Sequence, residues 1–406
     1  MAVYKLFPSK DASVYSAYPA MNTGLDAILD VSNLVTDRNP TAQVARSLIK
    51  FDQGEINDVL ENIAKVTGSA AWGTWDAHLK MYVAKATNVI IDSKVEIYPI
   101  SSSWNNGSGQ YLDKIQNDTG VSWKFEDYSG SVDVWPAGGW SPSSTGSYDK
   151  NWDINTAISN GTGGSWWTGS SGFVRAGDAL VITASQEYTL RSTKDLDVDV
   201  SDIVTMWYSS SGAVNIAGLV TKPNDGFLVK WEDSKEFVTQ SAISPQLSYY
   251  SVDTNTIYPP LLNMKWEDYY FSTGSSTNKI LGSQESFMSI YNNDGTYYSG
   301  SVARFRIAAI PKYPDVVFQT ASLYTTNFYL PENSSSYAIK DTDTNEFVIE
   351  FDDKYTNISA DATSSYFDVY MNGLEPERQY TVLIKSTIGG VTKVWDEDLM
   401  FKVING

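Results

Sequence analysis

Cysteine is absent from the 406 residues of this sequence, and histidine occurs only once, as His78. Without cysteine there are no thiol nucleophiles, thiolate metal sites or disulfide bonds, so packing alone must stabilise the fold. With one histidine, a histidine-rich zinc site is excluded, and a Ser-His-Asp triad would have to use His78. No Gly-x-Ser-x-Gly motif accompanies it. We therefore expect a surface or loop-covered histidine and no nucleophilic hydrolase activity.

Positively charged residues are also few. Lys and Arg number 29 against 48 Asp and Glu, which gives a formal net charge of −19. Such a chain would repel a polyphosphate backbone or an anionic lipid surface, so we expect no nucleic acid and no membrane among its partners. No run of 18 apolar residues predicts a membrane span, and the first fifteen residues lack the basic and apolar regions of an export signal.

Aromatic residues, by contrast, are abundant. They make up 13% of the chain and alternate with Val, Ile and Thr in short runs separated by Gly, Asn, Asp, Ser and Pro. This pattern is typical of β-strands joined by turns. The clearest predicted strands cover residues 27–31, 47–51, 78–83, 94–100, 226–231, 347–351, 366–370 and 380–385.

Helix is predicted at few places. Residues 53–65 carry apolar side chains at helical spacing, including Ile56, Leu60 and Ile63, and these form one apolar stripe. A shorter helical turn is expected over 111–116. Closely spaced strands with almost no helix between them predict an all-β fold of antiparallel sandwiches, and they argue against enzymes built from alternating strands and helices.

Two changes in composition predict the domain organisation. Residues 101–177 are rich in Trp, Gly and Ser, which indicates long loops laid over a sandwich that extends from residue 1 to about 255. The polar segment 252–260, with two consecutive prolines, ends this region. Residues 256–406 are again rich in predicted strands, and the proline-bounded segment near 311–320 offers a further division. Asp294-Gly295 predicts a hairpin turn.

Tryptophans in the loop region allow two interpretations. Large rings buried against the sandwich would anchor loops of this length, and this is the role we expect most. Exposed rings would instead stack on the apolar faces of sugars, and Trp140, Trp166 and Trp167 are the ligand-stacking candidates for that role. The tryptophans concerned are Trp123, Trp135, Trp140, Trp152, Trp166 and Trp167.

An ordered series of motifs runs through the first 250 residues. It includes Asp11-Ala12-Ser13-Val14-Tyr15, Asn22-Thr23-Gly24, the arginine-led strand 46–52, the strand 77–83, and Asp199 to Val204 with Trp207. The series resembles the DNRLRE-type β-sandwich domain, a jelly-roll relative of some carbohydrate-binding modules that recurs in extracellular, cell-wall and phage proteins. The resemblance implies a jelly-roll fold and fixes no sugar-binding residue.

Near the other end, Leu374-Glu375-Pro376 is followed by Tyr380. This spacing resembles the tyrosine corner of fibronectin type III and other immunoglobulin-like domains, in which the tyrosine hydroxyl satisfies a backbone group in the preceding turn. The resemblance implies an immunoglobulin-like final sandwich. Its last two strands would be joined by a hairpin at Ile388-Gly389-Gly390-Val391.

The block from residue 265 to 370 resembles virion structural proteins of large tailed bacteriophages, including marine ones. Its landmarks are the segments 265–268, 303–306, 311–314 and 366–370. The resemblance implies a non-enzymatic virion component of the connector or neck, tail, baseplate or fibre region. Such a protein would assemble in the host cytoplasm and dock onto other virion proteins in several copies or as a homo-oligomer. The alternatives are a carbohydrate-binding adhesin and, less favoured, a glycan-degrading enzyme with paired carboxylates.

Two acidic segments are weak calcium candidates. Asp195, Asp197 and Asp199 alternate with apolar residues, so their carboxylates share one strand face. Asp341, Asp343 and Asn345 imitate the start of a calcium loop, but Glu346 stands where an EF-hand requires glycine. A solvated acidic rim or a hairpin turn is the favoured interpretation of each. We predict no catalytic residues and no cofactor.

The net charge also predicts how copies or partners meet. Acidic faces repel one another, so contacts should use apolar and aromatic patches or exposed strand edges, with carboxylates at the rim. We expect the carboxy-terminal sandwich to be the docking module, because the phage resemblance is concentrated there.

Overall fold

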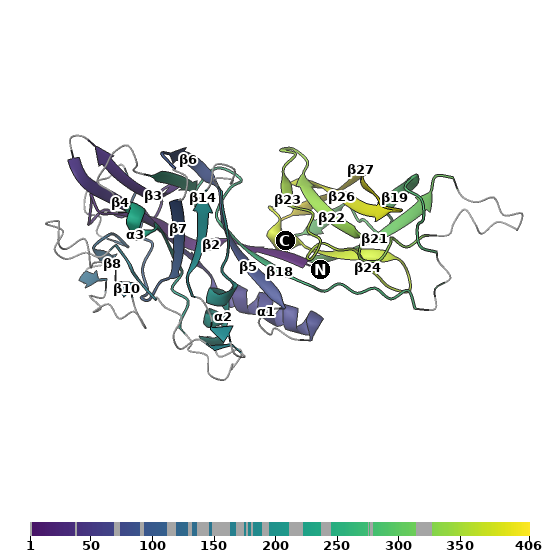
Figure 1. Cartoon of the computed structure of the whole chain (residues 1–406), viewed down its shortest axis with the longest axis horizontal. Helices are drawn as coiled ribbons and strands as arrows, with labels where there is room; N and C mark the ends of the chain where they lie inside the picture. The colour runs from purple at the N-terminus through teal and green to yellow at the C-terminus, as the bar shows by residue number, and fades with distance from the viewer. Residues whose placement is uncertain are drawn as a thin grey trace, which may run out of the picture. The chain divides into compact units, whose positions relative to one another are not determined.

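A computed structural model of the chain describes residues 2–36, 39–68, 74–89, 93–111, 119–128, 132–135, 146–147, 163–167, 174–175, 178–179, 182–188, 195–210, 222–236, 245–274, 276, 279–313 and 327–406 (Figure 1). Two compact units are present. We call Leu6–Glu61 with Asp76–Asn263 the amino-terminal unit, and Met1–Lys5, Asn62–Trp75 and Met264–Gly406 the carboxy-terminal unit. No helix in the described ranges is long and apolar enough to cross a membrane.

The amino-terminal unit is built on one large antiparallel sheet. Its strand order is β14-β7-β16-β4-β3-β17-β6, and β2 pairs with β4 off this path. The strands are β2 (Pro8–Tyr15), β3 (Ile28–Thr36), β4 (Asn39–Phe51), β6 (Val83–Thr87), β7 (Ser93–Pro99), β14 (Ala184–Tyr188), β16 (Phe227–Trp231) and β17 (Gln246–Tyr250). The predicted all-β sandwich class is confirmed, because β-strands dominate both units.

A smaller sheet has the order β1-β18-β5-β15. Its strands are β1 (Ala2–Leu6), β18 (Leu261–Trp266), β5 (Trp75–Met81) and β15 (Leu196–Asp199). Along β5, buried and partly exposed residues alternate, with Leu79 and Met81 buried and His78 and Lys80 on the other face. The predicted position of His78 outside the core is therefore confirmed.

In the described part of the chain, three α-helices accompany these sheets. Helix α1 (Gln53–Thr67) confirms the predicted amphipathic helix, and its apolar stripe is buried. Helix α2 (Ser201–Ser210) was not expected. Most of its side chains from Ser201 to Tyr208 are buried, so it has no polar face and gives no amphipathic period. The single turn α3 (Asp233–Glu236) follows β16. Most of the predicted helical turn over 111–116 lies outside the described residues.

Between residues 101 and 182, the described strands form only short antiparallel pairs. They are β8 (Phe125–Tyr128) with β9 (Val132–Val134), β10 (Gly146–Ser147) with β11 (Ser165–Trp166), and β12 (Val174–Arg175) with β13 (Asp178–Ala179). Longer strands return at β14. Within the described residues, this agrees with the predicted stretch of loops.

The carboxy-terminal unit contains two sheets with the strand order of an immunoglobulin sandwich. One has the order β19-β21-β25-β24 and the other β20-β27-β26-β22-β23. A shared core contains Phe305, Phe367, Tyr337, Trp395 and Phe401. The strands are β19 (Ser286–Ile290), β20 (Thr296–Tyr298), β21 (Val302–Pro311), β22 (Ser335–Asp341), β23 (Phe347–Ile349), β24 (Ser359–Ala360), β25 (Ser365–Tyr370), β26 (Gln379–Ile388) and β27 (Val391–Ile404), with a short 3₁₀ helix, η4 (Met371–Gly373).

The predicted tyrosine corner and terminal hairpin are confirmed. The Tyr380 hydroxyl donates to the Glu375 carbonyl oxygen at 2.9 Å. Gly389 and Gly390, with φ of 61° and 82°, join β26 to β27. A turn with positive φ at both central residues favours glycine at these positions. Residues close together in the sequence therefore determine how β26 begins and how it turns into β27.

The predicted Asp294-Gly295 turn lies between two strands that pair antiparallel, β19 and β21, but it is not a tight hairpin. Gly295 adopts a positive φ of 77°, and the strand that follows it directly, β20, does not pair with β19. Strand β19 pairs with β21, whereas β20 pairs in parallel with β27 in the other sheet. The turn therefore carries the chain from one sheet to the other, because Thr296 to Tyr298 extend the edge of the second sheet.

Removing the Tyr380 hydroxyl tests the corner. Tyr380 is 1% exposed, so Tyr380→Phe leaves the Glu375 carbonyl without this donor in a closed environment. We expect the free energy of unfolding to fall by about 1–2 kcal/mol, measured by urea unfolding. Tyr313→Phe, at a ring that is 74% exposed, is the control and should have no effect. Equal stabilities of both variants would contradict the role of the corner.

The first strand contributes to the carboxy-terminal unit. Val3 of β1 belongs to the same core cluster as Phe305 and Phe401. The Asn372 side-chain amide donates to the Tyr4 hydroxyl at 2.6 Å. A Cβ atom on Gly373 would lie 3.1 Å from the Lys5 nitrogen, so this close approach favours glycine. The unit thus combines the start of the chain with its last part.

Candidate functional site

The three aspartates near β15 bind donors of the protein itself. The Asp195 carboxylate accepts from the Val83 N–H at 2.8 Å, and Asp197 contacts the His78 ring nitrogen at 2.9 Å. Asp199 accepts from the backbone N–H and the hydroxyl of Ser201 at the start of α2. Each carboxylate therefore has a different local partner. Among the described residues, no group of three or more acidic or histidine side chains could hold a metal ion.

The second acidic segment is the turn between β22 and β23. Asp341 accepts from the Asp343 and Thr344 N–H groups and from the Arg378 guanidinium. Burial raises the pKa of Asp341, but these hydrogen bonds outweigh it and hold the pKa below its usual value. Asp343 and Asn345 are exposed. The structure thus has the hairpin turn that we favoured over a calcium loop.

Four tryptophans form a second core in the amino-terminal unit. Trp104, Trp123, Trp135 and Trp166 cluster with aliphatic residues of β2, β4 and β16, and each is at most 5% exposed. The predicted anchoring role of Trp123, Trp135 and Trp166 is confirmed. Their burial leaves little ring surface for stacking on a sugar.

The remaining loop tryptophans differ from these four. Trp167 is half-buried, and the Lys222 ammonium lies 3.7 Å from its ring centroid. A cation at this distance occupies one face of the ring. Trp140 and Trp152 lie outside the described residues.

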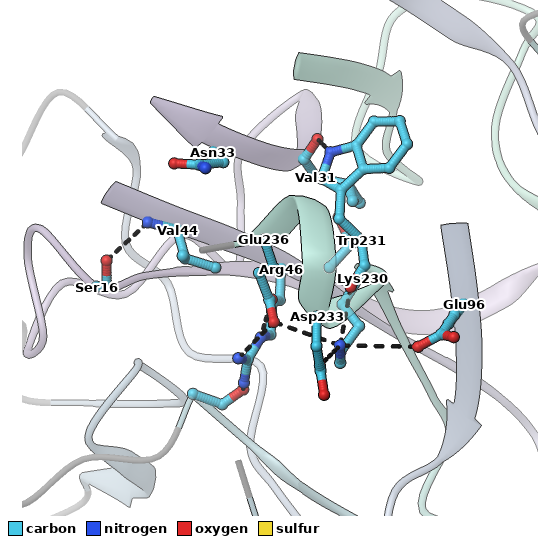
Figure 2. A network of polar contacts seen from close by, with 12 residues as sticks. Ser16, Val31, Asn33, Val44, Arg46, Glu96, Lys230, Trp231, Asp233 and Glu236 are labelled. Atoms are coloured by element: carbon cyan, nitrogen blue, oxygen red, sulfur yellow. Dashed lines mark hydrogen bonds and ion pairs between the residues drawn. The ribbon is translucent and has the colours of Figure 1, made fainter. Parts of the chain in front are cut away.

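A buried ion network is centred on Arg46 and Glu236 (Figure 2). The Arg46 guanidinium donates to both carboxylate oxygens of Glu236, at 2.6 and 3.1 Å, and to the Gly163 carbonyl oxygen at 2.9 Å. It lies 4.7 Å from the Trp123 ring centroid and 5.4 Å from that of Trp166. Arg46 and Glu236 are both 0% exposed. The pair therefore links β4, α3 and the loop region around a cation held between aromatic rings.

Lys230 extends the network across the sheet. Its ammonium lies 3.3 Å from Glu236 and 3.8 Å from Glu96, and it donates to Asp233 at 2.8 Å (Figure 2). Lys230 is 1% exposed. Every charge of the network thus faces an opposite charge, which is what burial of ionic groups requires. With its central charges inaccessible to solvent, the network has the properties of a structural link.

A cavity of about 270 Å³ lies in the amino-terminal unit and is lined mainly by polar and tyrosine side chains. Its lining includes Tyr15, Tyr18 and Tyr111, whose rings meet edge to face, with centroids 5.0 Å apart for Tyr15 and Tyr111. The Asp30 carboxylate accepts from the Tyr15 hydroxyl at 2.7 Å and from the Ser248 hydroxyl at 2.6 Å. Burial, followed by the charge of Asp30, raises the pKa of Tyr15. The Tyr15 hydroxyl therefore remains a donor at neutral pH.

A second candidate is a broad face of the carboxy-terminal unit. Alternate residues of β19, β21 and β25 point away from the core, and the register aligns Phe287 with Ile310 and Val302 with Tyr370. Phe287, Tyr291 and Val302 are 57%, 52% and 55% exposed. We call the solvent-facing side of these three strands the outer face. It consists of Phe287, Tyr291, Val302, Arg304, Arg306, Ile310, Tyr366, Asp368 and Tyr370.

Charges on the outer face are paired. Arg304 forms two hydrogen bonds to Asp368 at 2.8 and 2.9 Å, and its guanidinium lies 4.1 Å from the Tyr366 ring centroid. Arg306 pairs with Asp361, and this hydrogen bond holds the pKa of the Asp361 carboxyl well below its usual value. The two arginines are thus oriented by their ion pairs and lie 4.1 and 5.6 Å from the Tyr366 ring centroid. No net charge results from the two pairs, although the chain as a whole carries −19.

Comparisons of the chain with protein-family models, with curated proteins and with solved structures give no match. The arguments for the candidate sites therefore depend on the arrangement of their residues in this structure. Sequence patterns favoured apolar patches on the carboxy-terminal sandwich but did not reveal the tyrosine-lined cavity. Its walls come from segments near residues 15, 30, 43, 85, 111 and 246, and no local motif connects them.

Proposed function

We propose that the protein is a non-enzymatic structural component of a tailed-phage virion that docks onto another virion protein through the outer face. The observation that carries this proposal is the uneven distribution of exposed apolar side chains. Twelve large apolar or aromatic residues of the described chain are strongly exposed, and ten of them belong to the carboxy-terminal unit. Three of the ten, Phe287, Tyr291 and Val302, lie on the outer face, and an exposed apolar patch of this kind is typical of protein interaction surfaces.

The composition of the outer face supports a protein partner. Tyrosine, phenylalanine and arginine are enriched in protein interfaces and supply most of their binding energy. Here Phe287 and Tyr291 offer large rings, while the ion pair with Asp368 already orients Arg304. Pre-oriented side chains lose little conformational entropy on docking. Because Arg304 is paired with Asp368 and Arg306 with Asp361 beside the face, we expect the docked state to depend only weakly on salt.

The arrangement of titratable groups supports a non-enzymatic role. His78 contacts Asp197, and the candidate carboxylates accept hydrogen bonds from backbone groups, hydroxyls or Arg378. A general acid or base needs to reach a substrate proton within hydrogen-bond distance. Groups committed to turns and helix starts are more simply explained as structural, and both sandwich units present extended rigid surfaces suited to assembly.

Charge introduced on the outer face tests the proposal. We expect Phe287→Asp, at a ring 57% exposed, to reduce the amount of the chain in purified phage particles about tenfold or more, because a carboxylate would be buried at the contact. Quantitative mass spectrometry of particles assembled with each variant measures this. Circular dichroism should show that the variant is folded.

Val391→Asp is the matched control. Val391 is 52% exposed in the same unit but lies in the β26–β27 hairpin rather than on the outer face. Its incorporation should equal that of the wild type. The proposal is wrong if the wild-type chain is absent from the particles, or if both variants are incorporated equally well. The full chain is needed for this test because Val3 packs in the core of the carboxy-terminal unit.

A further inference from the structure

The floor of the tyrosine-lined cavity is an ordered set of polar side chains on three strands. In the register, Lys85 of β6 lies opposite Ser248 of β17, and Ser248 lies opposite Asp30 of β3. Gln246 and Ser32 form the next row. Alternate residues of a strand point to the same side, so both rows face the cavity that they line. The backbone of a sheet therefore fixes the spacing of these donors and acceptors.

The carboxylate of Asp30 is oriented and has unused hydrogen-bonding capacity. Tyr15 and Ser248 each donate one hydrogen bond to it, one to each oxygen. An ionised carboxylate has about four acceptor sites, so Asp30 can accept further hydroxyl groups from a ligand. The side-chain amides of Gln43 and Gln246, which also line the cavity, both donate and accept. This combination matches a ligand whose groups are themselves both donors and acceptors.

The charge of the lining and the size of the cavity further restrict which ligands can bind. The lining contains one cationic side chain, Lys85, and one anionic side chain, Asp30, so a ligand with net charge gains little from the site as a whole. A volume of about 270 Å³ lies just below the range of pockets for drug-sized ligands, which begins near ~300 Å³, so the cavity suits a smaller ligand. Tyr18 and Tyr111 are only partly buried. Their rings offer apolar surface beside the polar floor, as an amphipathic ring requires.

We propose that this cavity binds a single ring of a neutral sugar. The hydroxyl groups of the sugar bond to Asp30 and Gln246, and an apolar face of its ring packs against Tyr111. This site belongs to the amino-terminal unit and is separate from the loop tryptophans. It is independent of docking through the outer face, so either proposal can fail without the other.

Binding of monosaccharides to the full-length chain tests the site. Glucose, galactose, mannose and N-acetylglucosamine are each titrated separately and followed by ligand-observed NMR. We expect at least one of them to bind with a millimolar or tighter Kd. Tyr111→Ala and Gln246→Ala should each weaken this binding about tenfold, because each removes a contact to the ring. Tyr298→Ala, at an exposed ring of the carboxy-terminal unit, is the matched control and should leave Kd unchanged.

Three results would overturn the proposal. The first is the absence of binding by all four sugars at tens of millimolar. The second is binding that survives both cavity substitutions but is lost in Trp167→Ala, which would place the site at the loop tryptophans. The third is tighter binding of charged glucuronate or glucosamine than of the neutral sugars, since the balanced lining predicts the opposite.

Discussion

Replacing Arg46 with leucine is expected to lower the free energy of unfolding by about 3–5 kcal/mol, because the substitution leaves Glu236 buried without its main partner. Both side chains of this pair are at most 1% exposed. The Lys230 ammonium, 3.3 Å from Glu236, compensates only in part, since it is shared with Asp233. Leucine also removes the cation between Trp123 and Trp166. Urea unfolding followed by circular dichroism measures the loss.

Two further variants separate charge burial from simple loss of contact. The double substitution Arg46→Leu with Glu236→Leu removes both charges, so it should regain part of the stability lost by the single variant. Arg304→Leu breaks an ion pair in which the arginine side chain is 46% exposed, and it should cost no more than about 1 kcal/mol. If Arg46→Leu is no more destabilising than Arg304→Leu, the network does not hold the loop region.

The second large effect concerns pH. Asp11 is 1% exposed, and burial raises its pKa to about 7 despite the hydrogen bond that its carboxylate accepts from the Val252 N–H. In the unfolded chain this carboxyl releases its proton near pH 3.8. Between these two values the folded state binds more protons than the unfolded state. Stability contributed by Asp11 is therefore fully present below the unfolded pKa and is lost as the pH rises towards 7.

Asp11→Asn should remove this loss, because asparagine stays neutral and can still accept from Val252. We expect the free energies of unfolding of wild type and variant to be similar near pH 4. The variant should become more stable by up to about 4 kcal/mol at pH 8, since each pKa unit is worth about 1.4 kcal/mol. Asp361→Asn is a control in which the change of stability with pH should have the opposite direction, because Arg306 lowers the pKa of Asp361. Parallel pH profiles of wild type and Asp11→Asn would contradict the prediction.

Local sequence signals predicted much of the fold. Helix α1, the tyrosine corner at Tyr380 and the Gly389-Gly390 hairpin each depend on residues close together in the chain. The burial alternation of β5 likewise follows from neighbouring residues. In such cases a propensity or a period is enough, because the interactions that decide the structure lie within a few residues.

Features that depend on distant partners could not be predicted. Arg46 and Glu236 are separated by 190 residues, and only their proximity turns two ordinary charges into a buried pair. The parallel pairing of β20 with β27 lengthens the predicted Asp294-Gly295 connection between the paired strands β19 and β21. The sequence of helix α2 shows no amphipathic period, because nearly all of its side chains are buried. The walls of the tyrosine-lined cavity come from six separate segments of the chain. Tertiary context decides each of these outcomes.

The place of β1 also has a consequence for the time course of folding. Tyr4 accepts its hydrogen bond from Asn372, 368 residues further along the chain, and Val3 joins a core formed otherwise by residues beyond 280. Because the other members of this core lie so much further along the chain, β1 must wait for their synthesis before this core exists. Contacts of such long sequence separation close slowly. An unpaired strand is meanwhile open to wrong partners, so completion of the carboxy-terminal unit should be a late step and sensitive to interrupted translation.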